Sequence, residues 1–316
     1  MKRFASEELS VRTLTISQRY DGQRLDNFLI RELKGVPRSR VYRLIRRGEV
    51  RVNKKRCKPE FKLGIGDKLR IPPIRISGNK VHRERVSPVL VELFLSNILY
   101  ETEQFLVLNK PAGFPVQGGT GIKVNMIDTL RSVKSEWKGL ELAHRLDRDT
   151  SGCLIIAKNI ISLRYIQLQF KLRSIKKLYY AIVHGYWPNN LDAVNAPLVK
   201  NKLNSGERIV KVSVEGKESK TNFKVISRLR DATLLEIRPE TGRTHQIRVH
   251  CQHAGFPIIG DSKYKAESDN LNLTNSNKLC LHAARIEFKD PTSETLIEVD
   301  APIDKHFRSI LTNISK

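Results

Sequence analysis

The stretch AHRLDRDTSG, residues 143–152, brings ionisable and apolar residues together at one point of the chain. Ionisable side chains run from His144 to Asp149, interrupted only by Leu146, and the apolar run CLIIA follows at residues 153–157. Such a short apolar run predicts a buried strand. Charges crowded at the beginning of a buried strand are typical either of a surface turn or of an active site, and the rest of the chain must decide between them.

The second half of this stretch is typical of a turn. DTSG, residues 149–152, has the composition of an Asx-type turn before a strand. That turn does not account for Arg145 and Asp147, which precede it and alternate on one face of an extended segment. Neighbouring arginines favour the ionised form of a carboxyl group, so Asp147 suits nucleophilic attack or electrostatic stabilisation better than proton donation.

The chain carries a large excess of positive charge. Its 316 residues, 40% of them apolar, suit one large folded domain or two smaller ones. Lys and Arg number 57 against 33 Asp and Glu, a formal net charge of +24. Because self-repulsion destabilises a compact chain, such an excess usually serves a polyanionic partner, and nucleic acid is the expected one. An anionic membrane surface is the alternative, but no basic amphipathic helix with exposed Trp or Phe stands out.

No stretch of the sequence is typical of membrane insertion or secretion. The longest apolar runs have about five residues, far fewer than the roughly 20 that span a bilayer. The beginning, MKRFASEELS, has no apolar segment of the kind found in secretory signals. No two cysteines have CxxC spacing, which favours reduced thiols in a reducing compartment; they are Cys57, Cys153, Cys251 and Cys280. We therefore expect a cytoplasmic protein without a membrane segment.

No motif for a metal, a nucleotide phosphate or a serine nucleophile is complete. His245, His250 and His253 lie close together, but HExxH is absent and no cysteine or carboxylate pair has ligand spacing, so structural or RNA-facing histidines are expected. QGGTGIK, residues 117–123, lacks the GxxxxGK[ST] order and is interpreted as a flexible loop that closes on a substrate. Ser151 is not part of a GxSxG motif. We expect neither a metal nor a cofactor.

Residues 20–83 predict a small domain of two helices and short strands, after an N-terminal tail at residues 1–19. KGVP, residues 34–37, ends the first helix, and Ser39 is the expected N-cap of the second, RVYRLIRRG. The residues with helical spacing in the first helix are Leu25, Phe28, Leu29 and Leu33. The expected strands are EVRVN, residues 49–53, and KLRIP, residues 68–72.

The second helix of this small domain is strongly basic. From Arg31 to Lys58 the sequence has twelve Lys or Arg and two Glu. Arg40, Arg43 and Arg47 repeat at i, i+3 and i+7, which places them on one face of the helix. A solvated helix face normally mixes both signs, so a phosphate-binding surface is the favoured interpretation. The whole segment resembles the S4 RNA-binding domain, a small α-L motif.

A linker is expected at residues 84–92, and residues 93–316 then form the larger domain. The polar stretch at residues 265–278 is expected to be a loop. Apolar runs predict the strands of a mixed sheet at FLVLNK (105–110), CLIIAK (153–158), YYAIVHG (179–185), FKVISRL (223–229) and TLLEIRP (233–239). Helices packed on the sheet are expected at LRYIQLQFKL (163–172) and RTHQIRVHCQHAG (243–255).

Four motifs of this domain resemble, in sequence and in order, the RluA-type pseudouridine synthases. HRLDRDTSG resembles their signature, LVLNKPAG (106–113) their first motif, KLYYAIVHG (177–185) the strand that bears the active-site tyrosine, and GRTHQIRVH (242–250) their third motif. Segments of the small domain and NSGERIVKVSVEGK (204–217) are similar to the synthase C branch, which modifies large-subunit ribosomal RNA. The resemblance implies an α+β fold, in which an S4 domain precedes a synthase domain with a mixed, mostly antiparallel sheet flanked by helices.

The resemblance also implies roles for individual residues. Asp147 matches the essential aspartate, whose carboxylate attacks the uridine so that the base leaves the ribose and is rejoined through carbon. Tyr179 matches the tyrosine that stacks under the base and takes a proton in a later step, and Arg248 matches the basic partner of the aspartate. Arg145 matches the arginine that helps to extrude the target nucleotide, because a stacked base must be flipped before its glycosidic bond is accessible.

The implied substrate is 23S ribosomal RNA or its large-subunit precursor, at several uridines near the peptidyl-transferase region. The implied enzyme is a monomer that needs no metal and no cofactor. The sequence leaves open whether Asp147 attacks the sugar or the base.

Other interpretations stay open on the residues alone. Tyr179 also fits a strand residue inside the sheet, and Arg248 an exposed helical arginine that binds phosphate. Lys110 in LNKPAG either touches RNA phosphate or only supports the turn that follows it. A catalytically inert RNA-binding or ribosome-assembly protein is the alternative function, although it would be expected to lose Asp147 or its arginine partner. A glycosidase would need a second carboxyl group of raised pKa, and no candidate for it is identified.

Overall fold

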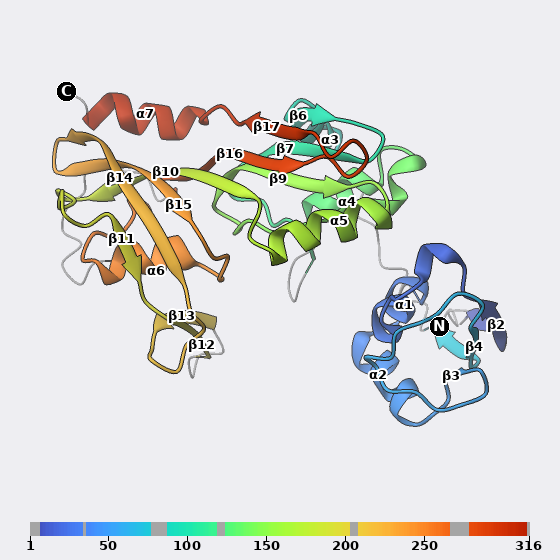
Figure 1. The fold of residues 1–316 in the computed structure, drawn as a ribbon. Helices are drawn as coiled ribbons and strands as arrows, with labels where there is room; N and C mark the ends of the chain where they lie inside the picture. The colour runs from blue at the N-terminus through green and yellow to red at the C-terminus, as the bar shows by residue number, and fades with distance from the viewer. Residues whose placement is uncertain are drawn as a thin grey trace, which may run out of the picture. The chain divides into compact units, whose positions relative to one another are not determined.

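The computed structural model describes residues 7–33, 36–76, 87–118, 124–202, 208–265 and 278–314. The chain divides into two compact units, residues 1–85 and residues 86–316 (Figure 1). Much of the glycine-rich stretch at 117–123 and of the polar stretch at 265–278, both expected to be loops, lies outside the described residues.

The smaller unit packs two helices on a short sheet. Helix α1 (Leu25–Glu32) and helix α2 (Arg38–Arg46) bury their apolar residues against one core, which includes Leu25, Leu29, Val41 and Leu69. Three antiparallel strands lie in the order β2 (Arg12–Thr15), β4 (Lys68–Ile71) and β3 (Arg51–Val52), and β1 (Glu7–Leu9) pairs with β5 (Ile74–Ile76). A 3-10 turn, η1, spans Gln18–Tyr20. The two predicted helices and both predicted strands are therefore present.

Three details of this region differ from the sequence-based expectations. Strand β2 pairs with β4, so part of the expected tail belongs to the sheet. Helix α2 has Pro37 at its N-cap, and Ser39 lies inside the helix and does not cap it; the fixed φ of proline suits the start of a helix. Helix α3 (Pro88–Leu95) begins inside the expected linker, because its apolar residues pack on the larger unit, where Phe94 is buried.

The larger unit is built on one mixed sheet of ten strands (Figure 1). Its main path is β11-β14-β15-β10-β16-β9-β7-β6, with β17 added beside β16 and β8 beside β9. All pairings are antiparallel except that between β9 and β16, which is parallel. The bounds are β6 Ile98–Glu101, β7 Phe105–Lys110, β8 Glu141–Leu142, β9 Ser151–Ala157, β10 Lys176–His184, β11 Ala193–Asn195, β14 Lys220–Leu229, β15 Ala232–Pro239, β16 Leu281–Lys289 and β17 Leu296–Asp300. The predicted mixed, mostly antiparallel sheet is confirmed.

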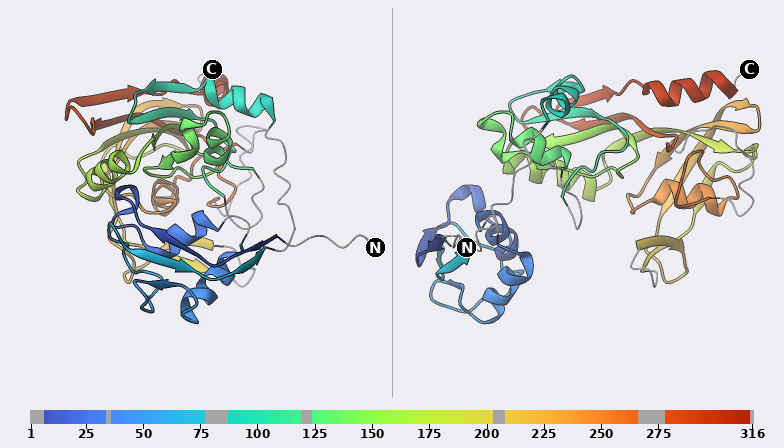
Figure 2. Two further views of the ribbon diagram at one scale, coloured as in Figure 1. Left: turned by 90° about the vertical axis from the view of Figure 1, so that its right-hand side faces the viewer. Right: turned by 180° about the vertical axis from the view of Figure 1, so that it is seen from behind.

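A separate hairpin and several short helices complete the larger unit. Strands β12 (Leu198–Lys202) and β13 (Arg208–Val212) pair only with each other. Figure 1 and Figure 2 show α7 (Lys305–Ile314) on one side of strands β10, β14 and β15 and α6 (Gln246–His253) on the other. The remaining helices are α4 (Met126–Arg131), the 3-10 turn η2 (Glu136–Gly139) and α5 (Ile160–Lys171). No described helix is long and apolar enough to cross a membrane.

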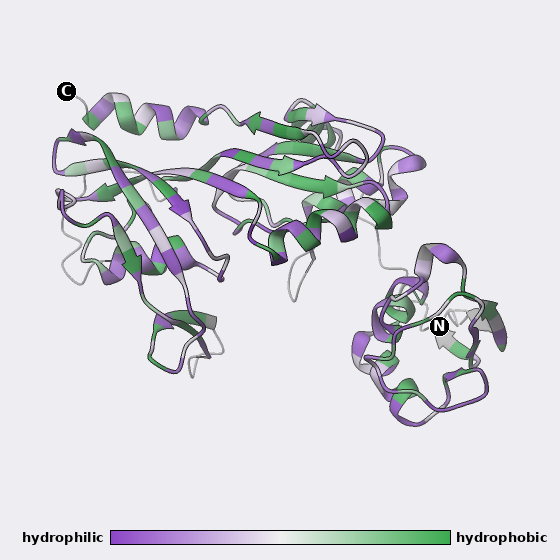
Figure 3. Ribbon diagram, viewed as in Figure 1, coloured by the Kyte–Doolittle hydropathy of each residue, from purple (hydrophilic) through white to green (hydrophobic). Residues whose placement is uncertain are grey.

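Strand β9 is buried on both faces, as its apolar sequence predicts. Cys153 and Ile155 contribute to a core with α5, and Leu154 and Ile156 to another with α4 and η2. Alternation of side chains along a strand explains this division, since successive residues point to opposite faces. Figure 3 shows the apolar colour concentrated along β7 and β9. This rigid centre supports the charged segment that precedes β9.

Helix α6 begins later than the sequence predicts. The expected helix covered residues 243–255, but the structure starts it at Gln246. His245 at the N-cap has a left-handed backbone, with φ 53° and ψ 20°. Gln246 fixes this bend, because its side-chain amide bonds Thr241, the Arg243 N–H and two groups of β14. The bend directs the residues before α6 towards the loop that carries Asp147.

Candidate active site

Asp147 lies on the loop between β8 and β9, and the beginning of β9 fixes that loop. Gly152 pairs with Ala283 across the parallel β9–β16 contact and has φ +107°. A Cβ at position 152 would lie 2.1 Å from the Ala283 carbonyl oxygen, so only glycine fits. The Thr150 N–H donates to the Asp147 carbonyl at 3.3 Å, so the turn covers residues 147–150 and β9 has already begun at Ser151. The predicted Asx-type turn at residues 149–152 is therefore placed too late, and the Asp149 carboxylate pairs with the Arg148 guanidinium at 3.0 Å.

Lys110, the last residue of β7, anchors the same loop. Its side chain has no exposed surface, and its ammonium donates to the carbonyl oxygens of Pro111 and Arg148, each at 2.8 Å. Burial lowers the pKa of Lys110 to about 7, against the opposite influence of Asp149 and Asp147. A direct contact with RNA phosphate, the first interpretation of Lys110, does not fit this position because the ammonium is enclosed. The alternative interpretation, support of the turn, agrees with its hydrogen bonds.

Arg248 links Asp147 to a second carboxylate that the sequence analysis did not identify. Its Nη1 donates to Asp147 Oδ2 at 3.3 Å, while Nε and Nη2 donate to the two oxygens of Asp261 at 2.7 Å each. Arg248 is 6% exposed and Asp261 5%. Burial alone would lower the pKa of the Arg248 guanidinium, but hydrogen bonding and charge from Asp261 outweigh it and hold that pKa above its usual value. The interpretation of Arg248 as an exposed phosphate-binding residue therefore does not fit.

Tyr179 lies on β10, at a register shift in its pairing with β16 between Leu178 and Tyr179. Such bulges re-aim side chains next to active sites, and Tyr179 lines the same cleft as Asp147. Burial, and then the charge of Asp147, raise the pKa of the phenol. The hydroxyl therefore keeps its proton at neutral pH. Tyr180, the next residue, does not line the cleft and packs against the core beside α6 and α7.

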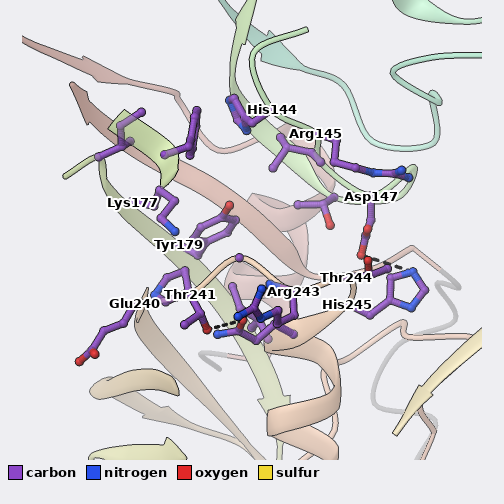
Figure 4. A pocket seen from close by; sticks show the side chains of 18 of the residues that line it. His144, Arg145, Asp147, Lys177, Tyr179, Glu240, Thr241, Arg243, Thr244 and His245 are labelled. Atoms are coloured by element: carbon purple, nitrogen blue, oxygen red, sulfur yellow. Dashed lines mark hydrogen bonds and ion pairs between the residues drawn. The ribbon is translucent and has the colours of Figure 1, made fainter. Parts of the chain in front are cut away.

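The cleft around these residues has a volume of about 560 Å³ and is strongly basic. Arg145 is exposed at its edge while Leu146, the next residue, is buried, so Arg145 and Asp147 share the cleft side of the loop as predicted. Figure 4 shows Arg145 and Asp147 of the β8–β9 loop, Tyr179 of β10 and His245 before α6 around one space. Its cationic lining residues are Arg145, Lys171, Arg173, Lys177, Arg243 and Arg248, against the two carboxylates Asp147 and Glu240.

Burial lowers the pKa of two basic side chains that line the cleft, His144 and Lys177. His144 accepts a hydrogen bond from the Ile155 N–H at 2.9 Å through Nε2, and burial, with the charge of Lys177, lowers its pKa to about 3. Burial and the nearby Arg173 lower the pKa of Lys177 to about 8. No carboxylate of the described residues forms an ion pair with Lys177. Its charge is therefore available to an anion in the cleft.

Arg40, Arg43 and Arg47 belong to the smaller unit and are not part of this cleft. Arg43 and Arg47 are exposed, and Arg40 is half-buried. The rest of the helix faces the core through Val41, Leu44 and Ile45. The arginines thus lie on the outer surface of α2, where the predicted phosphate-binding surface stays a prediction.

Two histidines of this unit, His250 on α6 and His282 on β16, have internal hydrogen-bond partners. His250 is buried and bonds Thr221, Ser219 and the Ala196 carbonyl, and His282 bonds Ser151 and the Ala301 carbonyl. Within the ranges that the structure describes, no three His, Cys, Asp or Glu side chains gather in the manner of a metal site.

Four residues of the site were not predicted from the sequence: His245, Asp261, Tyr264 and Lys177. His245 and Lys177 stand inside two of the four motifs of the larger domain, two or three residues from a predicted site residue. Asp261 and Tyr264 follow α6 in a segment without a recognisable pattern. Only the folded chain shows that Asp261 pairs with Arg248 and that Tyr264 lies under the Arg248 guanidinium, 5.1 Å from ring centre to Cζ.

An aspartate bound by a buried arginine, in a basic cleft on a mixed sheet, fits the catalytic domain of an RNA-modifying enzyme. Comparison with known families agrees: residues 104–253 match the family described as RNA pseudouridylate synthase, and residues 23–69 match the S4 domain. The chain belongs to the RNA pseudouridylate synthase family.

Curated relatives and solved structures extend this result. Proteins named "Ribosomal large subunit pseudouridine synthase C" are similar over nearly the full length. The one from Escherichia coli K12 is 47% identical over 98% of both chains, and the one from Haemophilus influenzae is 45% identical over 96% of this chain and 95% of its own. The structure titled "Human RNA Pseudouridylate Synthase Domain Containing 4" aligns with a TM-score of 0.59 and 25% identity, covering 72% of this chain and 95% of that one.

Proposed function

We propose that this protein isomerises uridines of 23S ribosomal RNA to pseudouridine, and that Asp147 is the residue that reacts. The observation that carries the proposal is the Asp147 carboxylate, partly exposed in a basic cleft and bound by Arg248 at 3.3 Å. The names of the full-length relatives support large-subunit ribosomal RNA as the substrate. Several uridines near the peptidyl-transferase region are the proposed targets.

The reaction needs a base that has left its helix. Arg145, exposed at the edge of the cleft, is proposed to occupy the space of the extruded nucleotide or to hold its backbone. The Asp147 carboxylate then attacks the sugar or the base ring, and the bond between ribose C1′ and N1 of the base breaks. The detached base turns and is rejoined to C1′ through C5. The C5 proton passes to solvent, N1 takes up a proton, and the Asp147 carboxylate is released unchanged. No atom is lost or gained between uridine and pseudouridine, so the cleft has to retain the detached base throughout.

Tyr179 is proposed to support the base by stacking. It lines the cleft with Asp147, and its phenol is protonated because burial raises its pKa. A group that already holds its proton is a poor acceptor, so the proton-accepting role implied by the resemblance is disfavoured. Arg248 is proposed to orient the Asp147 carboxylate before the uridine arrives.

A glycosidase is a weaker alternative for a specific reason. Glu240 is the second carboxylate that lines the cleft, and such an enzyme would need one of raised pKa as its acid. The Glu240 carboxylate instead accepts hydrogen bonds from Lys220 at 2.8 Å and Asn222 at 3.0 Å, and these lower its pKa. An inert RNA-binding protein is also disfavoured, since Asp147 and Arg248 are both retained and paired.

The test is the Asp147→Asn variant, which keeps the shape of the side chain and removes its charge. The gene replaces its counterpart in a bacterial host, and pseudouridines of 23S ribosomal RNA are mapped by carbodiimide-dependent stops of reverse transcription. Wild-type protein should produce stops that Asp147→Asn does not. Asp149→Ala, whose carboxylate lies two residues away and pairs with Arg148, is the matched control and should keep them. Equal stops with Asp147→Asn and wild type would refute the proposal.

A further inference from the structure

His245 lies beside Asp147 in a strained backbone conformation. Its φ of 53° is left-handed, a region that residues other than glycine seldom adopt. Its side chain does not cap α6. Instead, Nε2 lies 3.8 Å from Asp147 Oδ2 (Figure 4). On the other side of the ring, Nδ1 lies 2.7 Å from the Tyr264 hydroxyl. Strained residues that the surrounding structure holds in place cluster at functional sites. A functional role is therefore expected for His245.

Tyr264 determines which nitrogen of His245 carries the proton. The Tyr264 hydroxyl accepts a hydrogen bond from the Val210 N–H of β13 at 3.1 Å. A phenol has one proton to donate, and within the described part of the chain its remaining partner is His245 Nδ1. With Nδ1 as acceptor, the ring N–H of a neutral His245 is on Nε2 and faces Asp147. Burial lowers the pKa of His245 despite the opposing charge of Asp147, and Arg248 and Lys263 lower it further.

Tyr264 is itself fixed. It is 1% exposed and packs with Leu198, Val210 and Val249, which belong to β12, β13 and α6. The Arg248 guanidinium lies over its ring. One buried tyrosine therefore holds in place both groups that approach Asp147, and it ties them to the β12–β13 hairpin.

Both donors approach the same oxygen of Asp147. Arg248 Nη1 lies 3.3 Å and His245 Nε2 3.8 Å from Oδ2. Among the described residues, Oδ1 has no hydrogen-bond partner. We propose that His245 is a positioning residue: with Arg248 it holds Oδ2 of Asp147, so that Oδ1 is the oxygen that meets the uridine. The inference rests on the proposed function of Asp147. The distance of 3.8 Å is that of the free enzyme, in which such hydrogen bonds are often long and shorten when substrate binds.

Two amide substitutions of His245, which differ by one methylene group, separate this positioning role from a structural one. His245→Gln keeps an N–H donor at about the reach of Nε2. His245→Asn tolerates the left-handed backbone and still reaches Tyr264, but it is too short to reach Asp147. The assay is single-turnover pseudouridine formation on a 23S RNA fragment at saturating enzyme, with RNA affinity measured separately.

We expect His245→Asn to slow the reaction about 10- to 100-fold with unchanged RNA affinity, since misplacement of a reacting group acts on the chemical step. His245→Gln should recover most of the rate. A wild-type rate for His245→Asn, a loss confined to RNA affinity, or a His245→Gln variant as slow as His245→Asn would each overturn the inference. Failure of the wild-type enzyme to form pseudouridine would instead refute the proposed function.

Tyr264→Phe provides a second test if the His245 variants do not fold. It keeps the ring under Arg248 and removes only the hydroxyl that fixes the His245 proton. We expect a slower chemical step, by less than in His245→Asn, and unchanged RNA affinity. A wild-type rate for a folded Tyr264→Phe variant would contradict the role assigned to this hydrogen bond.

Discussion

Arg248 is bound more closely to Asp261 than to Asp147. Both of its hydrogen bonds to Asp261 are 2.7 Å long, in a two-pronged arrangement, whereas its single bond to Asp147 is 3.3 Å long. Asp261 therefore neutralises most of the charge of the buried arginine and sets its orientation. Asp147 accepts only one hydrogen bond from Arg248, and its carboxylate stays available to a substrate.

Asp261→Asn should impair catalysis although Asp261 does not line the cleft. The amide cannot balance the buried guanidinium, so Arg248 is expected to turn fully towards Asp147 and to hold both its oxygens. We expect the single-turnover rate to fall about 100-fold, as for other misplaced reacting groups, with little change in RNA affinity. Loss of a buried ionic partner should also lower stability by about 3–5 kcal/mol, which thermal unfolding measures. A folded Asp261→Asn enzyme with the wild-type rate would contradict this account.

Lys177→Met should make the protein more stable and bind RNA less tightly. The pKa of Lys177 is lowered to about 8 by burial and Arg173, so below that pH the folded protein bears the cost of a buried charge. Removing it should stabilise the fold at pH 7 by about 1–3 kcal/mol. RNA should bind more weakly and with a salt slope lower by about one, since one phosphate contact is lost.

The pH dependence follows from the same lowered pKa. Between pH 8 and the ordinary lysine value the unfolded chain binds more protons than the folded one, so wild-type stability should rise over this range relative to Lys177→Met. RNA affinity of the wild type should fall as pH rises through about 8. Lys176→Met is the control, because Lys176 is exposed on the same strand and pairs with Glu287. A Lys177→Met protein less stable than wild type would contradict the prediction.

The sequence predicted the site where its residues are local and failed where they are not. Asp147, Arg145 and the strand behind them lie in one short segment. Tyr179 and Arg248 lie in two further motifs that resemble those of the family. Asp261 pairs with Arg248 across a loop whose path no residue pattern indicates. The bend at His245 was also missed, because helical spacing continues through it and the left-handed φ has no glycine or asparagine to mark it.

Lys110 was identified from the sequence, but the direction of its side chain was not. A lysine is usually exposed, so the sequence favoured a phosphate contact of Lys110 as much as a structural role. The fold encloses it because β7 ends directly beneath the Asp147 loop, where the carbonyls of Pro111 and Arg148 need a donor. Motif spacing identifies such a residue but not the direction of its side chain.

Lys110→Met should therefore act on stability and on the chemical step, not on RNA binding. The substitution leaves the Pro111 and Arg148 carbonyls without their buried donor, each at a cost of about 1–3 kcal/mol. It also releases the loop before Asp147, so the single-turnover rate should fall by about tenfold or more. Affinity and its salt slope should match the wild type. A lower salt slope for a folded Lys110→Met protein would restore the phosphate contact as the better interpretation.

Charge reversal on α2 should weaken RNA binding without touching the cleft. Arg40→Glu, Arg43→Glu and Arg47→Glu together remove three cationic groups from the surface of the smaller unit. If each neutralises one phosphate, the slope of log K against log salt should fall by about two to three units. The matched variant with glutamine at the same positions should lower the slope similarly but the affinity less, because it adds no repulsion. The single-turnover rate at saturating enzyme should stay at the wild-type value in both. An unchanged slope in either variant would show that RNA does not meet this face of α2.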